Sequence, residues 1–147
     1  MNAREFLNQL RKLDNLIQNK IAEKEQWKSI SKNITPLSNG ERVQASSEQQ
    51  KMADAVIKYI DLETEIEKLI DLLVDKRKEI ISIIEQVDNS LQYNVLNKHY
   101  VQYKPFTVIA EEEHYSYAYI LEIHRKSLKE VEKILQNPIL SYDNIVI

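Results

Sequence analysis

The residues of this chain that are best suited to contacts with another molecule lie within residues 104–129. A short apolar segment, with Ile109 and Ala110 as its inward positions, is followed by Ser116 and then by a longer amphipathic segment. Serine is a favoured helix N-cap, and two helices joined by a tight turn are the minimum unit that presents a helix to the major groove of DNA. The spacing therefore predicts a helix-turn-helix.

The outward side chains of this unit divide by the part of DNA that each could contact. Donors that suit phosphate oxygens belong to Lys104, Thr107, Ser116 and Lys129. The candidate base readers are Tyr117, Ala118, Glu122 and Arg125. Alanine can touch a thymine methyl, glutamate can accept from cytosine and arginine can bind guanine. Tyr117 and Tyr119 also suit packing against a partner protein, because aromatic residues are enriched in interfaces. The candidate DNA-binding residues are Lys104, Thr107, Ser116, Tyr117, Ala118, Tyr119, Glu122, Arg125, Lys126 and Lys129.

The sequence contains little that could form a catalytic or metal site. It has no cysteine, which excludes a disulfide, a thiolate zinc site and a cysteine nucleophile. His99, His114 and His124 lack the i, i+4 spacing of zinc-binding helices, and no glycine-rich phosphate loop or GxSxG motif is present. Glu111 and His114 match half of a di-metal bundle motif, which needs two such pairs and further carboxylates. We therefore expect a non-enzymatic protein without catalytic residues, metal or cofactor.

The composition indicates that long helices position these residues. The 147 residues include one glycine and three prolines, whereas average usage would give about ten glycines and sheet proteins need many glycine-containing turns. Long elements rich in Leu, Ile, Glu, Lys and Gln are helices. The predicted fold class is all-α, with a long antiparallel helical hairpin (coiled coil) followed by a small C-terminal helix-turn-helix domain.

The hairpin is predicted within residues 1–88. Its first helix, about residues 3–32, has apolar residues at helical spacing and a charge of +3, from seven Lys and Arg against four acids. A loop is expected at about residues 33–47, where Pro36 and Asn39-Gly40 break the pattern. Ser46 or Ser47 then offers an N-cap for a second helix over about residues 48–87.

The second helix carries a predicted coiled-coil seam. Nine of its eleven positions are apolar at alternating spacings of four and three, which is typical of a heptad repeat. Residues 51–88 hold ten acids against six bases, a charge of −4, so we expect antiparallel pairing with the positive first helix. The seam is equally compatible with pairing across a homodimer. It consists of Met52, Val56, Tyr59, Glu63, Ile66, Ile70, Leu73, Arg77, Ile80, Ile84 and Val87.

Residues 89–137 are predicted to form the helix-turn-helix domain, and residues 138–147 an apolar tail. Ile120 and Ile123 of the last helix are expected to face inward, onto the inward residues of the helix before it. The last turns of the second long helix, around residues 80–87, are expected to pack on this domain. The expected helices are 91–103, 106–113 after Pro105, and 117–135 with Ser116 as its cap.

No apolar run approaches the roughly 20 residues that a membrane helix needs, and the charged start MNAREFLNQLRKLD is unlike a signal peptide. We therefore expect a cytoplasmic protein that does not contact a membrane. The net charge of −3 and the sequence pI of about 5.7 argue against strong non-specific DNA binding, which usually requires a basic face.

Several residues of the last third carry a resemblance to a known DNA-binding segment. They are Leu96, His99-Tyr100, Ile109-Ala110, Tyr115-Ser116, Ile120, His124 and Ser127-Leu128. This pattern resembles region four of sigma factors. With the opening AREFLNQLRKLDNLI, the VQASS before the second long helix and the YS…H…SL ending, the chain is similar to the RinA/ArpU-like regulators of Gram-positive prophages. The resemblance covers nearly all of residues 3–135, with about ten specific residues.

The resemblance implies a phage-encoded transcription regulator of the late-gene type. Such a protein would act in the cytoplasm of the bacterial host on double-stranded promoter or operator DNA, as a homodimer or beside RNA polymerase. The sequence departs from sigma-type recognition helices, which present Arg and Gln after the serine. Here Tyr117, Ala118 and Tyr119 follow it, and Arg125 and Lys126 come later. Residues 97–135 hold six bases and six acids, so the module is neutral.

An alternative function follows from the same elements. The hairpin and the aromatic-rich last helix would then bind a host or phage protein, and the helix-turn-helix would no longer read DNA. Surface charge separates the two hypotheses. A face formed by Lys98, Lys104, Arg125, Lys126 and Lys129 with the acids behind it favours DNA, whereas an aromatic and acidic face favours a protein.

Overall fold

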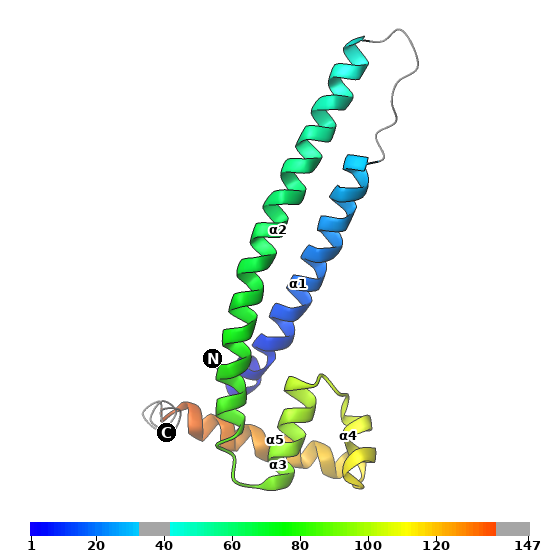
Figure 1. Cartoon of the computed structure of the whole chain (residues 1–147). Coiled ribbons are helices and arrows are strands. Elements are labelled where there is room, and N and C mark those ends of the chain that lie inside the picture. The colour runs from blue at the N-terminus through cyan, green and yellow to red at the C-terminus, as the bar shows by residue number, and fades with distance from the viewer. Residues whose placement is uncertain (33–41, 138–147) are drawn as a thin grey trace. The chain divides into compact units, whose positions relative to one another are not determined.

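The computed structural model describes residues 1–32 and 42–137, and every regular element in this part of the chain is a helix. A long antiparallel pair, α1 and α2, is followed by a small C-terminal helical cluster (Figure 1). The predicted all-α fold class is confirmed. The elements are α1 Ala3–Lys32, α2 Arg42–Ile84, α3 Ser90–Leu96, the π-helix η1 Asn97–Val101, α4 Phe106–Glu113 and α5 Tyr117–Leu135.

The start of α2 differs from the prediction. The helix begins at Arg42, so the expected loop is wrong over residues 42–47, and neither Ser46 nor Ser47 is an N-cap. Once a helix is nucleated, each further residue adds one hydrogen bond at small cost, and Arg42–Ile84 continues without interruption over 43 residues. Residues 33–41 of the predicted loop and the predicted tail, 138–147, lie outside the described residues.

The chain divides into two compact units, each containing part of both long helices. The first consists of Met1–Leu13 together with Leu73–Ile147, and the second of Asp14–Leu72. The candidate interface belongs to the first unit, because α3, η1, α4 and α5 all lie within it.

In the second unit, α1 and α2 pair through a narrow apolar row and a few charges. The buried side chains are those of Ile17, Ala55, Leu62 and Ile66. Lys20 Nζ of α1 lies 3.0 Å from Glu65 Oε1 of α2, in line with the opposite charges predicted for the two helices. The ammonium groups of Lys24 and Lys28 lie 5.8 and 5.9 Å from the ring centroid of Tyr59. Exposed ion pairs contribute little stability, so the buried apolar row is the main contact between the two helices here.

The predicted seam of α2 is half wrong. Val56 and Ile70 are exposed, and so is Glu63, whereas Ala55 and Leu62 are buried. Two rows of mostly apolar residues run along α2, and every second position belongs to both. One row includes Val56, Glu63 and Ile70, and the other includes Ala55 and Leu62. The structure buries the row that lacks the glutamate. Burying Glu63 would remove a charge from water at high cost. The shared positions, which are buried or half-buried, are Tyr59, Ile66, Leu73, Ile80 and Val87.

The first unit is built around one larger core. The first turns of α1 and the last turns of α2 contribute to it, which confirms that the end of α2 packs on the helices that follow. The backbone N–H of Ala3 donates to Glu132 Oε2 at 2.8 Å and thereby ties the start of α1 to α5. The core cluster contains Ala3, Phe6, Leu7, Leu10, Ile80, Ile83, Ile84, Val87, Leu96, Tyr100 and Val131.

The third helix is shorter than predicted and changes type. It begins after Asn89, whose side chain accepts from the N–H of Gln92 at 3.0 Å, and it continues into η1 rather than remaining α-helical to residue 103. Tyr103 then has φ 60°, a left-handed conformation that ends the helix. The N–H of Lys104 donates to the carbonyl of Lys98 at 2.9 Å, and the chain turns into α4.

Candidate nucleic-acid interface

The packing of α4 against α5 creates the helix-turn-helix. Ile109 and Ala110 of α4 and Ile120 and Ile123 of α5 are buried together with Val95 of α3. The small side chain of alanine lets the two helices approach closely. The prediction that Ile120 and Ile123 face Ile109 and Ala110 is confirmed, and α5 is thereby held by one face only.

The turn between the two helices is defined by backbone hydrogen bonds and one cap. At the end of α4, the N–H of Tyr115 donates to the carbonyl of Ala110 at 3.1 Å and that of His114 to Glu111 at 3.3 Å. His114 has φ 61°, so this is a Schellman motif with histidine in the position usually taken by glycine. Ser116 Oγ accepts from the N–H of Tyr119 at 3.2 Å, which confirms the predicted cap. The direction in which α5 leaves the turn is therefore set locally.

A buried polar and aromatic cluster fixes η1 against α4 and α5. The hydroxyl of Tyr100 and Nε2 of His124 are hydrogen-bonded at 2.6 Å. His99 donates from Nδ1 to the carbonyl of Lys104, at 2.8 Å, since a carbonyl can only accept. The ring of Phe106 stacks on His99 at 3.9 Å between centroids and lies 4.6 Å from His124. Three elements therefore meet at these rings.

Burial keeps the ionisable groups of this cluster neutral. Together with smaller effects of the neighbouring His99 and Arg4, it lowers the pKa of His124 to about 4. It also lowers the pKa of His99, against the opposing effect of the hydrogen bond to Lys104. Burial raises the pKa of Tyr100 to about 12, although Arg4 and Arg11 oppose this rise. At neutral pH the cluster is therefore a structural element that orients α5 and carries no charge.

The side of α5 opposite to this core is exposed. Ala118, Glu122, Arg125 and Lys129 follow one another at spacings of four, three and four, so they share a helix face. All four are exposed. Glu122 Oε1 lies 3.7 Å from Nζ of the likewise exposed Lys126. This outward face holds two cations and one acid, with Lys126 paired to that acid, and it is exposed.

Aromatic side chains flank the N-terminal end of that face. Tyr117 is 51% exposed, and the rings of Tyr115 and Tyr119 lie 4.9 Å apart. Leu121 of α5 and Val108 of α4 are exposed as well. The predicted contact residues Tyr117 and Tyr119 are therefore accessible, and the first turns of α5 present more apolar than charged surface.

The lysines of η1 and the following loop are paired with acids of α4. Lys104 Nζ lies 2.7 Å from Glu112 Oε2, and Lys98 Nζ lies 3.0 Å from Glu113 Oε1 and 3.3 Å from Glu112 Oε1. The hydrogen bond from Lys104 is the main reason why the pKa of Glu112 is lowered, and that to Glu113 is the main reason why the pKa of Lys98 is raised. The structure thus does not bring Lys98 and Lys104 into one free basic face with α5.

Two further candidates lie at helix starts. Thr107 is exposed in the first turn of α4, where backbone N–H groups without intrahelical partners suit an anion. Ser116 is exposed, and its oxygen is used as the cap of α5 while its hydroxyl hydrogen remains a donor.

Two cations near the interface were absent from the sequence-based set. Arg4 and Arg11 lie on α1, far from α5 in sequence, yet both influence the pKa values of His99 and Tyr100. Only the packing of α1 on the C-terminal helices brings them there. The only hint of these two residues in the sequence was the positive charge of the first helix. That charge does not show which other helix α1 packs against.

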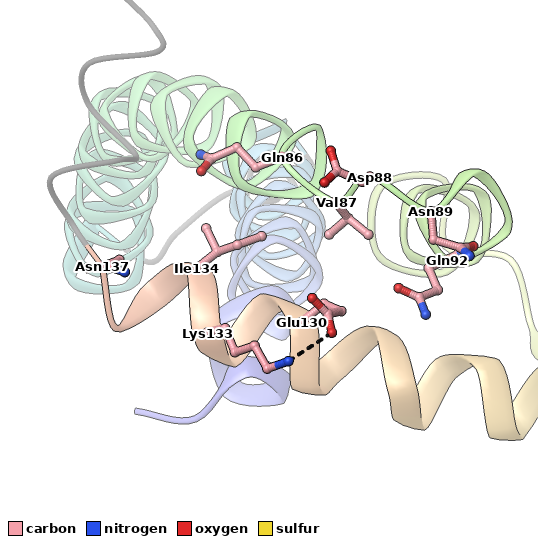
Figure 2. A pocket seen from close by; sticks show the side chains of 9 residues that line it. All are labelled: Gln86, Val87, Asp88, Asn89, Gln92, Glu130, Lys133, Ile134 and Asn137. Atoms are coloured by element: carbon pink, nitrogen blue, oxygen red, sulfur yellow. Dashed lines mark hydrogen bonds and ion pairs between the residues drawn. The ribbon is translucent and has the colours of Figure 1, made fainter.

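An open groove of the first unit lies where α2 ends, α3 begins and α5 ends (Figure 2). Val87 and Ile134 form its apolar part, and Glu130 and Lys133 are paired across 3.2 Å at its edge. The remaining lining residues are Gln86, Asp88, Asn89, Gln92 and Asn137. The groove lies at the other end of α5 from the exposed tyrosines.

Within residues 1–32 and 42–137, no group of three His, Cys, Asp or Glu residues is arranged to hold a metal ion. None of the helices described is both long and apolar enough to cross a membrane. Comparisons of the chain with protein-family models, with curated proteins and with solved structures returned no match.

Proposed function

We propose that the protein is a DNA-binding transcription regulator that reads double-stranded DNA with α5. One observation carries this proposal. The inner face of α5 is buried on α4 and α3, while Ala118, Glu122, Arg125 and Lys129 form an exposed face. A helix held in this way after a tight turn can enter the major groove. Its alanine, glutamate and arginine suit a thymine methyl, a cytosine amino group and a guanine.

The charge distribution limits how tightly the helix-turn-helix alone can bind. Lys98 and Lys104 are neutralised by Glu112 and Glu113, so few cations of this module remain for phosphates. Few phosphate contacts mean modest affinity and a shallow salt dependence. A second contact, through a homodimer or RNA polymerase bound beside it, would raise the effective affinity.

Arg125→Ala tests the reading helix. We expect the dissociation constant for a duplex selected from a random-sequence library to rise by a factor of about 5 to 150, which corresponds to about 1–3 kcal/mol. Specificity should relax at one base pair, because a single guanine contact is lost. Fluorescence anisotropy with the selected duplex and its single-base variants measures both effects. Absence of binding by the unchanged protein to any duplex at low salt contradicts the proposal.

Binding of another protein is a second candidate function, and the exposed tyrosines favour it. Tyr115, Tyr117 and Tyr119 lie near one another in sequence, and Leu121 on the same helix is exposed as well. Interfaces are enriched in aromatic residues. RNA polymerase is the partner that a transcription regulator would contact.

Replacing Tyr117 and Tyr119 together by alanine separates the two functions. If α5 binds purified bacterial RNA polymerase, we expect the double variant to lose affinity by a factor of about 30 or more, as for an interface hot spot of about 2 kcal/mol. Arg125→Ala should leave that affinity within a factor of about two, because surface substitutions away from a contact change little. Surface plasmon resonance with immobilised polymerase gives both values. Equal binding by the double variant and the unchanged protein contradicts this second function.

A further inference from the structure

The first turns of α1 lie against the helix-turn-helix. The N–H of Ala3 donates to Glu132 Oε2 of α5, and Ala3, Phe6 and Leu7 share the core cluster with Tyr100 of η1. These segments belong to one compact unit. The residues at the start of α1 are therefore held in a definite position beside η1 and α5.

Two arginines of α1 face this region. Arg4 interacts with the hydroxyl of Tyr100 and is near enough to His124 to lower its pKa. The guanidinium carbon of Arg11 lies 5.2 Å from the ring centroid of Tyr103, and both arginines lower the pKa of His99. Arg11 thus lies beside Tyr103, just after η1, and Arg4 acts electrostatically on Tyr100 of η1 and on His124 of α5.

Arg125 is exposed on α5, three positions before Leu128 and seven before Glu132. Arg125, Leu128 and Glu132 share one side of the helix, at spacings of three and four. Leu128 packs against the core cluster that includes the first turns of α1, and Glu132 binds the N–H of Ala3. Arg4 and the base-reading candidate Arg125 are therefore both exposed residues of the first unit, Arg4 beside the residue that is bonded to α5 and Arg125 on α5 itself.

Within the part of the chain that the structure describes, the arginines of α1 and the cations on the outward face of α5 are not held in ion pairs, unlike Lys98 and Lys104. No ion pair among the described residues involves Arg4, Arg11, Arg125 or Lys129. Arg4 is exposed and Arg11 is half-exposed, so each guanidinium can reach a molecule in solvent. Glu132, an acid on this side of α5, has its carboxylate engaged by the N-terminus of α1.

We propose that α1 forms a second DNA contact, in which the guanidinium groups of Arg4 and Arg11 bind phosphates of the strand that flanks the bases read by α5. This inference rests on the proposed function. Guanidinium binds phosphate oxygens through two parallel N–H donors and keeps its charge at every relevant pH. This contact supplies the positive charge for binding phosphates that the neutral helix-turn-helix lacks.

The test is the salt dependence of DNA binding by the double variant Arg4→Gln with Arg11→Gln. Each lost phosphate contact should reduce the slope of log affinity against log salt by about 0.9. The fall in affinity between 50 and 200 mM salt should then become about tenfold smaller than for the unchanged protein. Fluorescence anisotropy on one selected duplex, over a salt series, gives these slopes.

Two matched variants make the result specific. Lys24→Gln with Lys28→Gln removes two charges from the same helix, in the other unit, and should leave the slope unchanged. The double variant Arg4→Lys with Arg11→Lys keeps both charges and should restore the slope. Circular dichroism shows whether the glutamine variant is less well folded, and the lysine variant remains informative in that case. If the glutamine variant binds with an unchanged slope while Arg125→Ala still weakens binding, the α1 contact is wrong and the DNA function stands. If the unchanged protein binds no duplex, the DNA function itself is wrong.

Discussion

Replacing Ile120 by alanine should lower the free energy of unfolding by about 2–5 kcal/mol, the range found when a fully buried isoleucine or leucine is truncated. Ile120 is 0% exposed and packs with Ile109 and Ile123. The substitution leaves a cavity at the contact that holds α5 to α4. Urea denaturation followed by circular dichroism at 222 nm measures the change.

Leu121→Ala is the matched control, because it removes a side chain of the same volume from the next position of α5. Leu121 is 36% exposed, and substitutions at such positions change stability by about 0.5 kcal/mol or less. If Ile120→Ala and Leu121→Ala cost the same, the packing of α5 on α4 is not the contact that stabilises this unit. Comparing Ile120→Ala with Leu121→Ala would also show whether a loss of DNA binding, should the protein bind DNA, comes from unfolding or from a missing contact.

Acidification below the ordinary pKa of histidine should destabilise the first unit. Histidine has an ordinary pKa of about 6.5, whereas burial lowers the pKa of His124 to about 4. Between these values the unfolded chain binds a proton that the folded chain does not, so the free energy of unfolding falls as pH falls. Over the whole range between these two pKa values, the free energy of unfolding falls by roughly 3 kcal/mol. Burial also lowers the pKa of His99, which therefore acts in the same direction. Thermal melting between pH 7 and 4.5 checks this.

His124→Gln isolates the contribution of that ring. Glutamine does not titrate and can still hydrogen-bond with the hydroxyl of Tyr100, so the variant should lose much less stability than the unchanged protein between pH 7 and 4.5. Carboxylates with a lowered pKa, such as Glu112, lose their stabilising charge only at lower pH, through their folded pKa. Parallel curves for the two proteins would mean that His124 is not held neutral in the folded state.

The start and end of α5 were predictable because they depend on neighbours in sequence. The predicted bounds of α4 and α5 match the structure, and Ser116 is the cap that was expected. A cap acts within three residues, and the inward positions of a helix follow from its period of 3.6 residues. The contact of Ile109 and Ala110 with Ile120 and Ile123 follows from the same two rules.

The seam of α2 shows where periodicity stops being sufficient. Two overlapping rows, one with Val56 and Glu63 and the other with Ala55 and Leu62, fit the heptad almost equally well. The rotation of α2 against α1 selects the second row, because the first would bury a carboxylate. The length of α2 was underestimated for a related reason, since local breakers do not end a helix that propagates from a stable neighbour.

The sequence by itself determined that the chain is helical, where its last two helices begin and end, and which of their faces meet, because caps and helical periods are local. Only the tertiary structure decided which charges remain available. The pairing of Lys98 and Lys104 with Glu112, and the electrostatic effect of Arg4 on His124, join residues up to 120 positions apart. Electrostatic interactions depend on distance in space and on burial, and no spacing along the chain encodes either.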